Sequence, residues 1–304
     1  MSCSLGGKRV KEIKKVGVMG CGLMGAGIAQ VCAEAGFETI VREIEQRFID
    51  SGFRKIEDLW KKGVEKGKVT TESVAAARAK LTGTTDLGQM KDCDLVIDAL
   101  PEEIAIKKDV FKALDTIVPA STIIASNTSS LSVTEMATFA SHPERFIGMH
   151  FFNPVPVMKL VEVVKTIVTA EENLDAAFKF VQSLGKVGIA AKDNCGFIVN
   201  LLLVPYIFDA IRIFETGQAG IEDIDQAMRF GAAYPMGPFA LSDLVGLDTA
   251  YKIGGIMYEE NKEARYAPPG LLKKMVLMGY YGRKTGKGFY DYSQTPPKPT
   301  ELNF

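Results

Sequence analysis

The sequence predicts an α/β domain followed by an all-helical domain. At 304 residues the chain is longer than an average domain, so two domains are expected. Up to about residue 191, short apolar runs alternate with helical patterns, as in parallel βαβ units. From about residue 196 to 278 the patterns are helical only. We therefore expect an α/β domain over residues 1–193 and a helical domain over residues 194–304.

Each expected strand of the first half is a short apolar run, and most are followed by a segment of helical length. The strands are expected at residues 15–20, 38–43, 94–98, 122–125, 145–149, 159–164 and 187–191. The helices are expected at residues 22–35, 46–66, 71–80, 103–114, 133–139 and 174–184. In the second half, residues 197–208 are apolar nearly all round, which predicts a helix that is buried, for example at a subunit interface.

The composition is that of an ordinary globular protein, with 47% hydrophobic and 24% charged residues and a net charge of −1. Such a charge argues against nucleic acid as the main partner, and no apolar run is long enough to span a bilayer. The five cysteines have no CxxC pair, so we expect reduced thiols and no metal site. Residues 1–15 are rich in Lys and Arg, which fits either a remnant of a targeting segment or a solvated tail. The compartment stays open between cytosol and mitochondrial matrix.

A glycine-rich turn lies between the first expected strand and the first expected helix. Gly20, Gly22 and Gly25 form a G-x-G-x-x-G motif, in which the glycines allow a tight turn, close approach to a pyrophosphate and helix–strand packing. The helix N-terminus that follows offers N–H groups and a positive dipole end to phosphate. The cofactor contacts expected from this turn are Gly20, Gly22, Leu23, Met24 and Gly25.

An acidic residue ends the second expected strand. Glu43 lies 18 residues beyond Gly25, where a carboxylate can accept hydrogen bonds from both ribose hydroxyls and repels a 2′-phosphate. With the glycine motif, Glu43 predicts a Rossmann-type domain that binds NAD. A structural turn with a solvated glutamate is the alternative.

A polar run, Ser126 to Ser132, follows the strand expected at 122–125. Its side chains are therefore expected at the carboxyl edge of the sheet, where folds of this class bind ligands. Serine, threonine and asparagine also favour helix N-caps, so the run fits a cap for the next helix equally well.

His150 is one of only two histidines, and it ends another expected strand. Histidine can take and return a proton near neutral pH, which suits the base of a dehydrogenase; a histidine in apolar surroundings can also simply be part of the core. Glu162 interrupts an apolar run 12 residues later. If the two strands are neighbours, the carboxylate can accept from one imidazole nitrogen and raise the basicity of the other. The alternative is that Glu162 points outward from an alternating strand.

Six segments carry specific motifs that cover the chain from about residue 16 to 292. They begin at Gly20 (GCGLMGAGIAQ), Ser126 (SNTSSL), His150 (HFFNPVPVMKLVEV), Gly196 (GFIVN), Tyr234 (YPMGP) and Gly282 (GRKTGKGFY). Together they resemble the L-3-hydroxyacyl-CoA dehydrogenase family, which includes bacterial 3-hydroxybutyryl-CoA dehydrogenases. Against the family pattern the sequence has Leu201 for Arg, Cys195 for Pro, Pro101 for an aliphatic residue and Glu43 for Asp.

The resemblance implies oxidation of an (S)-3-hydroxyacyl-CoA to the 3-ketoacyl-CoA by NAD⁺, in fatty-acid β-oxidation or short-chain acyl-CoA metabolism. It assigns the base to His150, its orientation to Glu162, and the hold on the substrate oxygens to Ser129 and Asn200. It also implies a homodimer. The other cofactor contacts that it implies are Glu43, Glu102, Lys107, Ser129, Asn153 and Lys284, and its candidate CoA contacts are Lys62 and Lys66.

Two alternatives remain at this point. One is a related NAD-dependent dehydrogenase of a sugar acid, although the basic stretch 54–68 favours the phosphates of CoA. The other is a non-catalytic structural protein that binds NAD, against which the presence of all four reacting residues argues.

Overall fold

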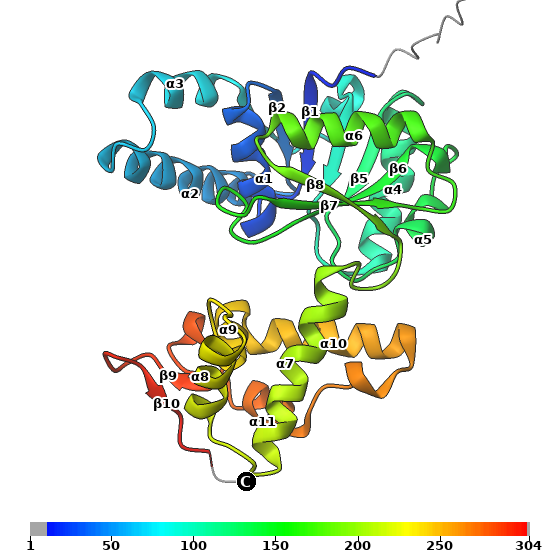
Figure 1. The fold of residues 1–304 in the computed structure, drawn as a ribbon. Helices are drawn as coiled ribbons and strands as arrows, with labels where there is room; N and C mark the ends of the chain where they lie inside the picture. Colours follow the sequence, from blue (N-terminus) through cyan, green and yellow to red (C-terminus); the bar gives the residue numbers. More distant parts are fainter. Residues whose placement is uncertain (1–10, 303–304) are drawn as a thin grey trace, which may run out of the picture. The chain divides into compact units, whose positions relative to one another are not determined.

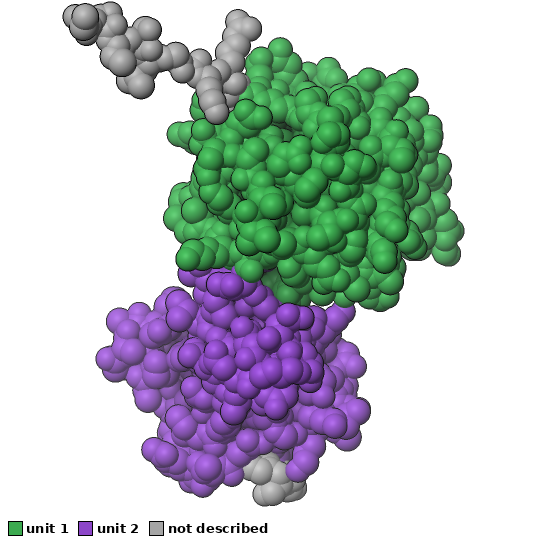
Figure 2. All heavy atoms as spheres, turned by 90° about the vertical axis from the view of Figure 1, so that its right-hand side faces the viewer, with its two compact units in different colours: residues 1–193 green, residues 194–304 purple. Residues whose placement is uncertain are grey.

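The computed structural model describes residues 11–302, and the chain forms two compact units, residues 1–193 and residues 194–304 (Figure 2). The first ten residues of the basic N-terminal stretch lie outside the described residues. None of the helices within 11–302 is both long and apolar enough to cross a membrane. Over the same residues, no three His, Cys, Asp or Glu side chains are grouped so that they could hold a metal ion.

Unit 1 is built on one sheet of eight strands in the order β3-β2-β1-β4-β5-β6-β7-β8, with helices packed against it (Figure 1). The strands are β1 (Lys15–Met19), β2 (Glu38–Arg42), β3 (Leu81–Thr84), β4 (Leu95–Asp98), β5 (Ile123–Ser126), β6 (Phe146–Phe151), β7 (Leu160–Lys165) and β8 (Val187–Lys192). The helices are α1 (Leu23–Glu34), α2 (Gln46–Glu65), α3 (Thr71–Ala79), α4 (Ile104–Ile117), α5 (Val133–Ala137) and α6 (Glu171–Ser183). This arrangement confirms the predicted α/β fold.

All seven strands expected in the first half are present, each within a few residues of its expected bounds. The sequence did not predict β3, whose four residues, Leu-Thr-Gly-Thr, contain one apolar side chain. This strand forms the edge of the sheet, pairs along β2 and buries Leu81, so its pairing partner specifies it more than its own composition does.

One pair of strands departs from the expected parallel pattern. Strands β6 and β7 pair antiparallel, while every other neighbouring pair in the sheet is parallel. The connection from Phe151 to Leu160 contains no helix, and a short connection of this kind can join only antiparallel neighbours.

The sheet order places the candidate site. From β1 the chain continues outward to β2 and β3 on one side, and it then crosses to β4 on the other side of β1. The carboxyl ends of β1 and β4 therefore flank the point where the strand order reverses. In open α/β sheets, ligands bind in the crevice at this point. The turn after β1 carries the glycine motif, and polar residues follow β4 and β5 at the same edge.

Over its described residues, 194–302, unit 2 has five α-helices and a two-stranded ribbon (Figure 1). Its elements are α7 (Val199–Glu215), α8 (Ile221–Gly231), α9 (Pro238–Val245), α10 (Leu247–Asn261), α11 (Gly270–Leu277), β9 (Tyr290–Asp291) and β10 (Lys298–Pro299). The helical prediction is confirmed, and the short ribbon near the end of the chain is an addition to it.

Helix α7 packs one face into the core of unit 2, through Val204, Ile207 and Phe208. On another side of the helix, Leu202 is 68% exposed. Burial of this side at a subunit interface stays a prediction.

The C-terminal motif folds around a buried acid. Asp243, at the end of α9, accepts hydrogen bonds from the N–H groups of Phe289 and Tyr290 and from the hydroxyl of Tyr292. The hydroxyl of Tyr290 donates in turn to Asp225. Burial raises the pKa of Asp243 to about 6, against the opposing effect of these hydrogen bonds.

This raised pKa predicts a pH-dependent stability. Between about pH 4 and pH 6 the folded chain keeps the Asp243 proton and the unfolded chain loses it, so the free energy of unfolding falls as the pH rises. The shift corresponds to up to about 3 kcal/mol. Thermal unfolding from pH 4 to pH 7 should show that Asp243→Asn flattens this fall. A stability difference between variant and wild type that does not vary with pH would contradict the assignment.

Candidate active site

The glycine turn between β1 and α1 has the geometry of a phosphate-binding loop. Gly20 has a φ of +99°, and a Cβ there would lie 2.8 Å from the carbonyl oxygen of Ala99. A Cβ on Gly25 would overlap the carbonyl oxygen of Gly20, whereas a Cβ on Gly22 would meet nothing within 4 Å. Gly20 and Gly25 therefore build the turn, and Gly22 lies on its open side.

The start of α1 fits an anionic group. No side chain caps this helix, and its first turn contains no acidic residue. The N–H groups of the first turn and the positive end of the helix dipole are therefore not compensated by a side chain. The pyrophosphate of NAD is the group that such a terminus binds in this fold. The residues present fit the cofactor.

Glu43 lies beside this turn, directly after β2. Its carboxylate accepts from the N–H of Cys21, at 2.6 Å, and from the N–H of Ile44, at 3.1 Å. A carboxylate has about four acceptor sites, so it retains capacity for ribose hydroxyls. Burial, with the nearby Glu43 charge, raises the pKa of the Cys21 thiol to about 12. Cys21 is therefore a protonated thiol near neutral pH, and the turn carries no thiolate nucleophile.

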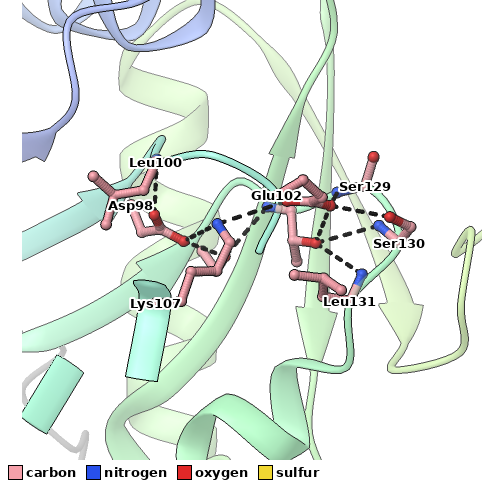
Figure 3. Close-up of polar contacts among 9 residues, drawn as sticks. Asp98, Leu100, Glu102, Lys107, Ser129, Ser130 and Leu131 are labelled. Carbon is pink, nitrogen blue, oxygen red and sulfur yellow. Dashed lines mark hydrogen bonds and ion pairs between the residues drawn. The ribbon is translucent and has the colours of Figure 1, made fainter. Parts of the chain in front are cut away.

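A buried ion-pair network follows the ends of β4 and β5 (Figure 3). The Lys107 side chain is 1% exposed, and its Nζ lies 2.6 Å from Asp98 Oδ2 and 3.6 Å from Glu102 Oε2. Asp98 also accepts from the hydroxyl of Ser126 and from the N–H of Leu100. Lys107 thus forms ion pairs with two carboxylates at once. Asp98 was not predicted as a site residue, because its only signal was an acid at the end of an otherwise apolar strand.

Glu102 holds the polar loop that follows β5. Its Oε1 accepts from the Thr128 hydroxyl at 2.5 Å, the Ser129 N–H at 3.0 Å and the Ser130 hydroxyl at 3.0 Å. Burial acts to raise the pKa of Glu102, but the Lys107 charge and these hydrogen bonds outweigh it and lower the pKa. Glu102 is therefore ionised at neutral pH, and its charge fixes the loop. The Ser129 side chain points away from this network (Figure 3).

The run from Ser126 to Ser132 contains a helix cap, as one hypothesis expects, while ligand binding by the rest of the run stays a prediction. Ser132 is the N-cap of α5, since its side chain accepts from the N–H of Glu135. Ser129 lies before the helix, in the loop held by Glu102. Asn127 Oδ1 accepts from the N–H of Phe151 at 2.8 Å, which joins the ends of β5 and β6. The same loop thus adjoins the strand end that carries His150.

His150 and Glu162 face each other across β6 and β7. They are register partners in the antiparallel pair, and His150 Nδ1 lies 2.7 Å from Glu162 Oε2. His150 is 7% exposed and Glu162 is 0% exposed, so Glu162 does not point outward from the sheet. When Nδ1 carries its proton toward the carboxylate, Nε2 is the nitrogen that carries the lone pair.

The other predicted site residues lie in several places. Asn153 is exposed in the connection after β6, and Lys62 and Lys66 are exposed at the end of α2. Asn200 and Lys284 belong to unit 2, where Asn200 is buried on α7 and the Lys284 ammonium donates to Asp248 at 2.6 Å. Unit 1 therefore contains the glycine turn, the Ser129 loop and the His150–Glu162 pair.

Comparisons with known proteins identify the family of this chain. Residues 15–194 match the family described as 3-hydroxyacyl-CoA dehydrogenase, NAD binding domain. Residues 196–292 match the family described as 3-hydroxyacyl-CoA dehydrogenase, C-terminal domain. The two matches cover most of the chain and meet within a few residues of the boundary between the units.

Individual relatives cover nearly the whole chain. A 3-hydroxybutyryl-CoA dehydrogenase of Mycobacterium tuberculosis is 46% identical over 92% of this chain and 99% of its own. The mitochondrial hydroxyacyl-coenzyme A dehydrogenase of Homo sapiens is 43% identical over 92% of this chain and 91% of its own. The crystal structure of an (S)-3-hydroxybutyryl-CoA dehydrogenase from Ralstonia eutropha matches with a TM-score of 0.89 and 40% identity, over 93% of this chain and all of that one. The chain belongs to the 3-hydroxyacyl-CoA dehydrogenase family of NAD-dependent oxidoreductases.

Proposed function

We propose that this chain oxidises the 3-hydroxyl group of an (S)-3-hydroxyacyl-CoA to a ketone with NAD⁺, and that His150 is the general base. The observation that carries the proposal is the buried pair of His150 Nδ1 and Glu162 Oε2, 2.7 Å apart at the end of β6. A base oriented by a third group is the arrangement that proton abstraction requires.

The reaction is balanced by two transfers from the substrate. His150 Nε2 takes the proton of the 3-hydroxyl group while the hydrogen on C3 leaves as hydride and the C–O bond becomes a carbonyl. Bound NAD⁺ supplies the hydride acceptor. Glu162 keeps the Nδ1 proton in place before the transfer and stabilises the imidazolium that forms. The proton then passes from His150 to solvent.

Other residues orient the reactants in this proposal. Ser129 donates its hydroxyl to the substrate oxygen, and the Glu102 contact with its backbone N–H holds the loop. Asn200 in unit 2 also hydrogen-bonds the substrate. Gly20, Gly22, Leu23, Met24 and Gly25 hold the pyrophosphate, and the remaining cofactor contacts are Glu43, Glu102, Lys107, Asn153 and Lys284. Lys62 and Lys66, exposed at the end of α2, are the candidate contacts for the CoA phosphates.

The substrate class is tested by an assay of NADH formation. Purified protein should turn over (S)-3-hydroxybutyryl-CoA in preference to free (S)-3-hydroxybutyrate. A preference for the free acid would favour the sugar-acid dehydrogenase alternative. Bound NAD without turnover of either compound would favour a non-catalytic role. A series of acyl-chain lengths then defines the preferred substrate.

Glu43→Ala should weaken NAD binding much more than it slows the chemical step. The variant loses the acceptor for the ribose hydroxyls, and a hydrogen bond to a charged group contributes about 1.5–3 kcal/mol, so the Kd should rise roughly tenfold to a hundredfold. Titration of NADH fluorescence measures this Kd, and kcat at saturating NAD⁺ measures the chemistry. Glu45→Ala, an exposed neighbour, is the control. An unchanged Kd would remove Glu43 from the ribose site.

The exposed face of α7 suits a homodimer contact, because Leu202 is 68% exposed on a helix that is apolar nearly all round. We place the enzyme in the mitochondrial matrix if the source is eukaryotic and in the cytoplasm if it is bacterial. The human relative is named as mitochondrial, and other relatives are bacterial.

A further inference from the structure

We propose that Asp193 is a positioning residue that fixes the loop of Ser129 from its C-terminal side. The inference rests on the proposed function of Ser129 as a substrate contact. Asp193 comes directly after β8, far from Ser129 in the sequence, and its half-buried carboxylate lies at the start of α5. It does not belong to the reacting pair of His150 and Glu162.

Three hydrogen bonds join this carboxylate to the start of α5. Oδ1 accepts from the N–H of Val133 at 3.0 Å, and Oδ2 accepts from the N–H of Thr134 at 2.6 Å and from the hydroxyl of Ser132 at 3.1 Å. Two of these donors are main-chain groups of the first turn, which have no partner within a helix. Asp193 therefore caps α5 from another part of the chain.

Helix α5 cannot hold this position by itself. It has five residues, and isolated helices shorter than about 12 residues are marginal in water. The Asp193 charge also matches the positive end of the helix dipole. Asp193, together with the buried side chains of Val133, Met136 and Ala137, therefore fixes the helix start and the end of the loop before it.

Ser129 lies between two carboxylate anchors. Glu102 accepts from the Ser129 N–H on one side, and Asp193 accepts from Ser132 and the two residues after it on the other. Only two residues separate Ser129 from Ser132. A loop held at both ends over so short a distance has little freedom, which is what a substrate-positioning hydroxyl requires.

Loss of the Asp193 anchor should disturb the placement of Ser129 and leave the glycine turn, which follows β1, intact.

Hydrogen exchange and kinetics of Asp193→Ala test the proposal. Peptides covering residues 127–137 should exchange at least about tenfold faster, since charge-assisted hydrogen bonds are lost, and peptides of α3 should not change. With (S)-3-hydroxybutyryl-CoA, kcat should fall about tenfold to a hundredfold, the cost of a small misplacement. The Kd for NADH should stay the same. Asp175→Asn, an exposed acid on α6, is the control and should leave all three measurements unchanged.

A double variant separates positioning from general stabilisation. If Asp193 acts through Ser129, most of the loss in kcat caused by Asp193→Ala should disappear in a Ser129→Ala background. Losses that multiply in full would overturn the proposal, and so would unchanged exchange of residues 127–137. If Asp193→Ala fails to fold, Asp193→Asn replaces it in the test. The asparagine side chain has nearly the same size, but its amide nitrogen would face the Thr134 N–H and cannot accept a hydrogen bond from it. If the wild type does not turn over acyl-CoA, the proposed function fails, and the exchange measurement still decides whether Asp193 fixes the loop.

Discussion

Replacement of His150 by glutamine should lower kcat by about two to four orders of magnitude, the usual contribution of a general base. Glutamine has a similar length and can keep a hydrogen bond to Glu162, but its amide cannot take the hydroxyl proton. The glycine turn and Glu43 lie after other strands, so the Kd for NADH should stay that of the wild type. Steady-state NADH formation with saturating substrate and a fluorescence titration measure the two quantities.

The chain offers a matched control for this variant. Its only other histidine, His142, is exposed and contacts Glu144 at 3.2 Å, away from the strand ends that carry the site. His142→Gln makes the same chemical change and should leave kcat unchanged. Turnover of His150→Gln near the wild-type rate would remove this residue from the mechanism.

Glu162→Gln should lower kcat by about two to four orders of magnitude through His150. The wild-type carboxylate can only accept, which keeps the proton of His150 on Nδ1 and the lone pair on Nε2. A glutamine amide can donate to Nδ1 instead, which favours the wrong tautomer, and it cannot stabilise the imidazolium. In the serine protease triad, the equivalent change of aspartate to asparagine costs about 10⁴ in kcat.

The size of Glu162→Gln is nearly that of the wild type, so the buried strand pair should remain packed, and a thermal melt checks this. Glu38→Gln, an exposed acid on β2, is the control for a lost carboxylate in the same sheet. A variant that melts like the wild type and turns over at the wild-type rate would show that the 2.7 Å contact is only structural.

Much of the fold was predictable because its signals are local. The strands of the sheet interior, such as β4 with Leu-Val-Ile-Asp, are apolar on both faces, and the glycine turn needs residues without a Cβ. Strand β3 was missed because a parallel edge pairing, and not its own composition, defines it. The sequence shows that α7 is apolar nearly all round, but it does not show which of its sides the same chain covers.

The candidate site was predictable only in part. The spacing of His150 and Glu162 is compatible with a contact between their side chains across neighbouring strands. The antiparallel register of β6 and β7 brings the two residues opposite each other. The supporting residues Asp98, Asn127 and Asp193 contact segments that are distant in the sequence. A single carboxylate or amide after a strand carries no sequence signal of its partner, so these residues emerge only from the folded chain.

The central claim is that His150 and Glu162 act as one unit, and the double variant His150→Gln/Glu162→Gln tests it most directly. Residues that act together are strongly non-additive. With (S)-3-hydroxybutyryl-CoA and NAD⁺ at saturation, the double variant should have a kcat within about threefold of His150→Gln alone, since Glu162 has no imidazole left to orient. A double variant whose loss equals the product of the two single losses would contradict the account, because Glu162 would then act independently of His150.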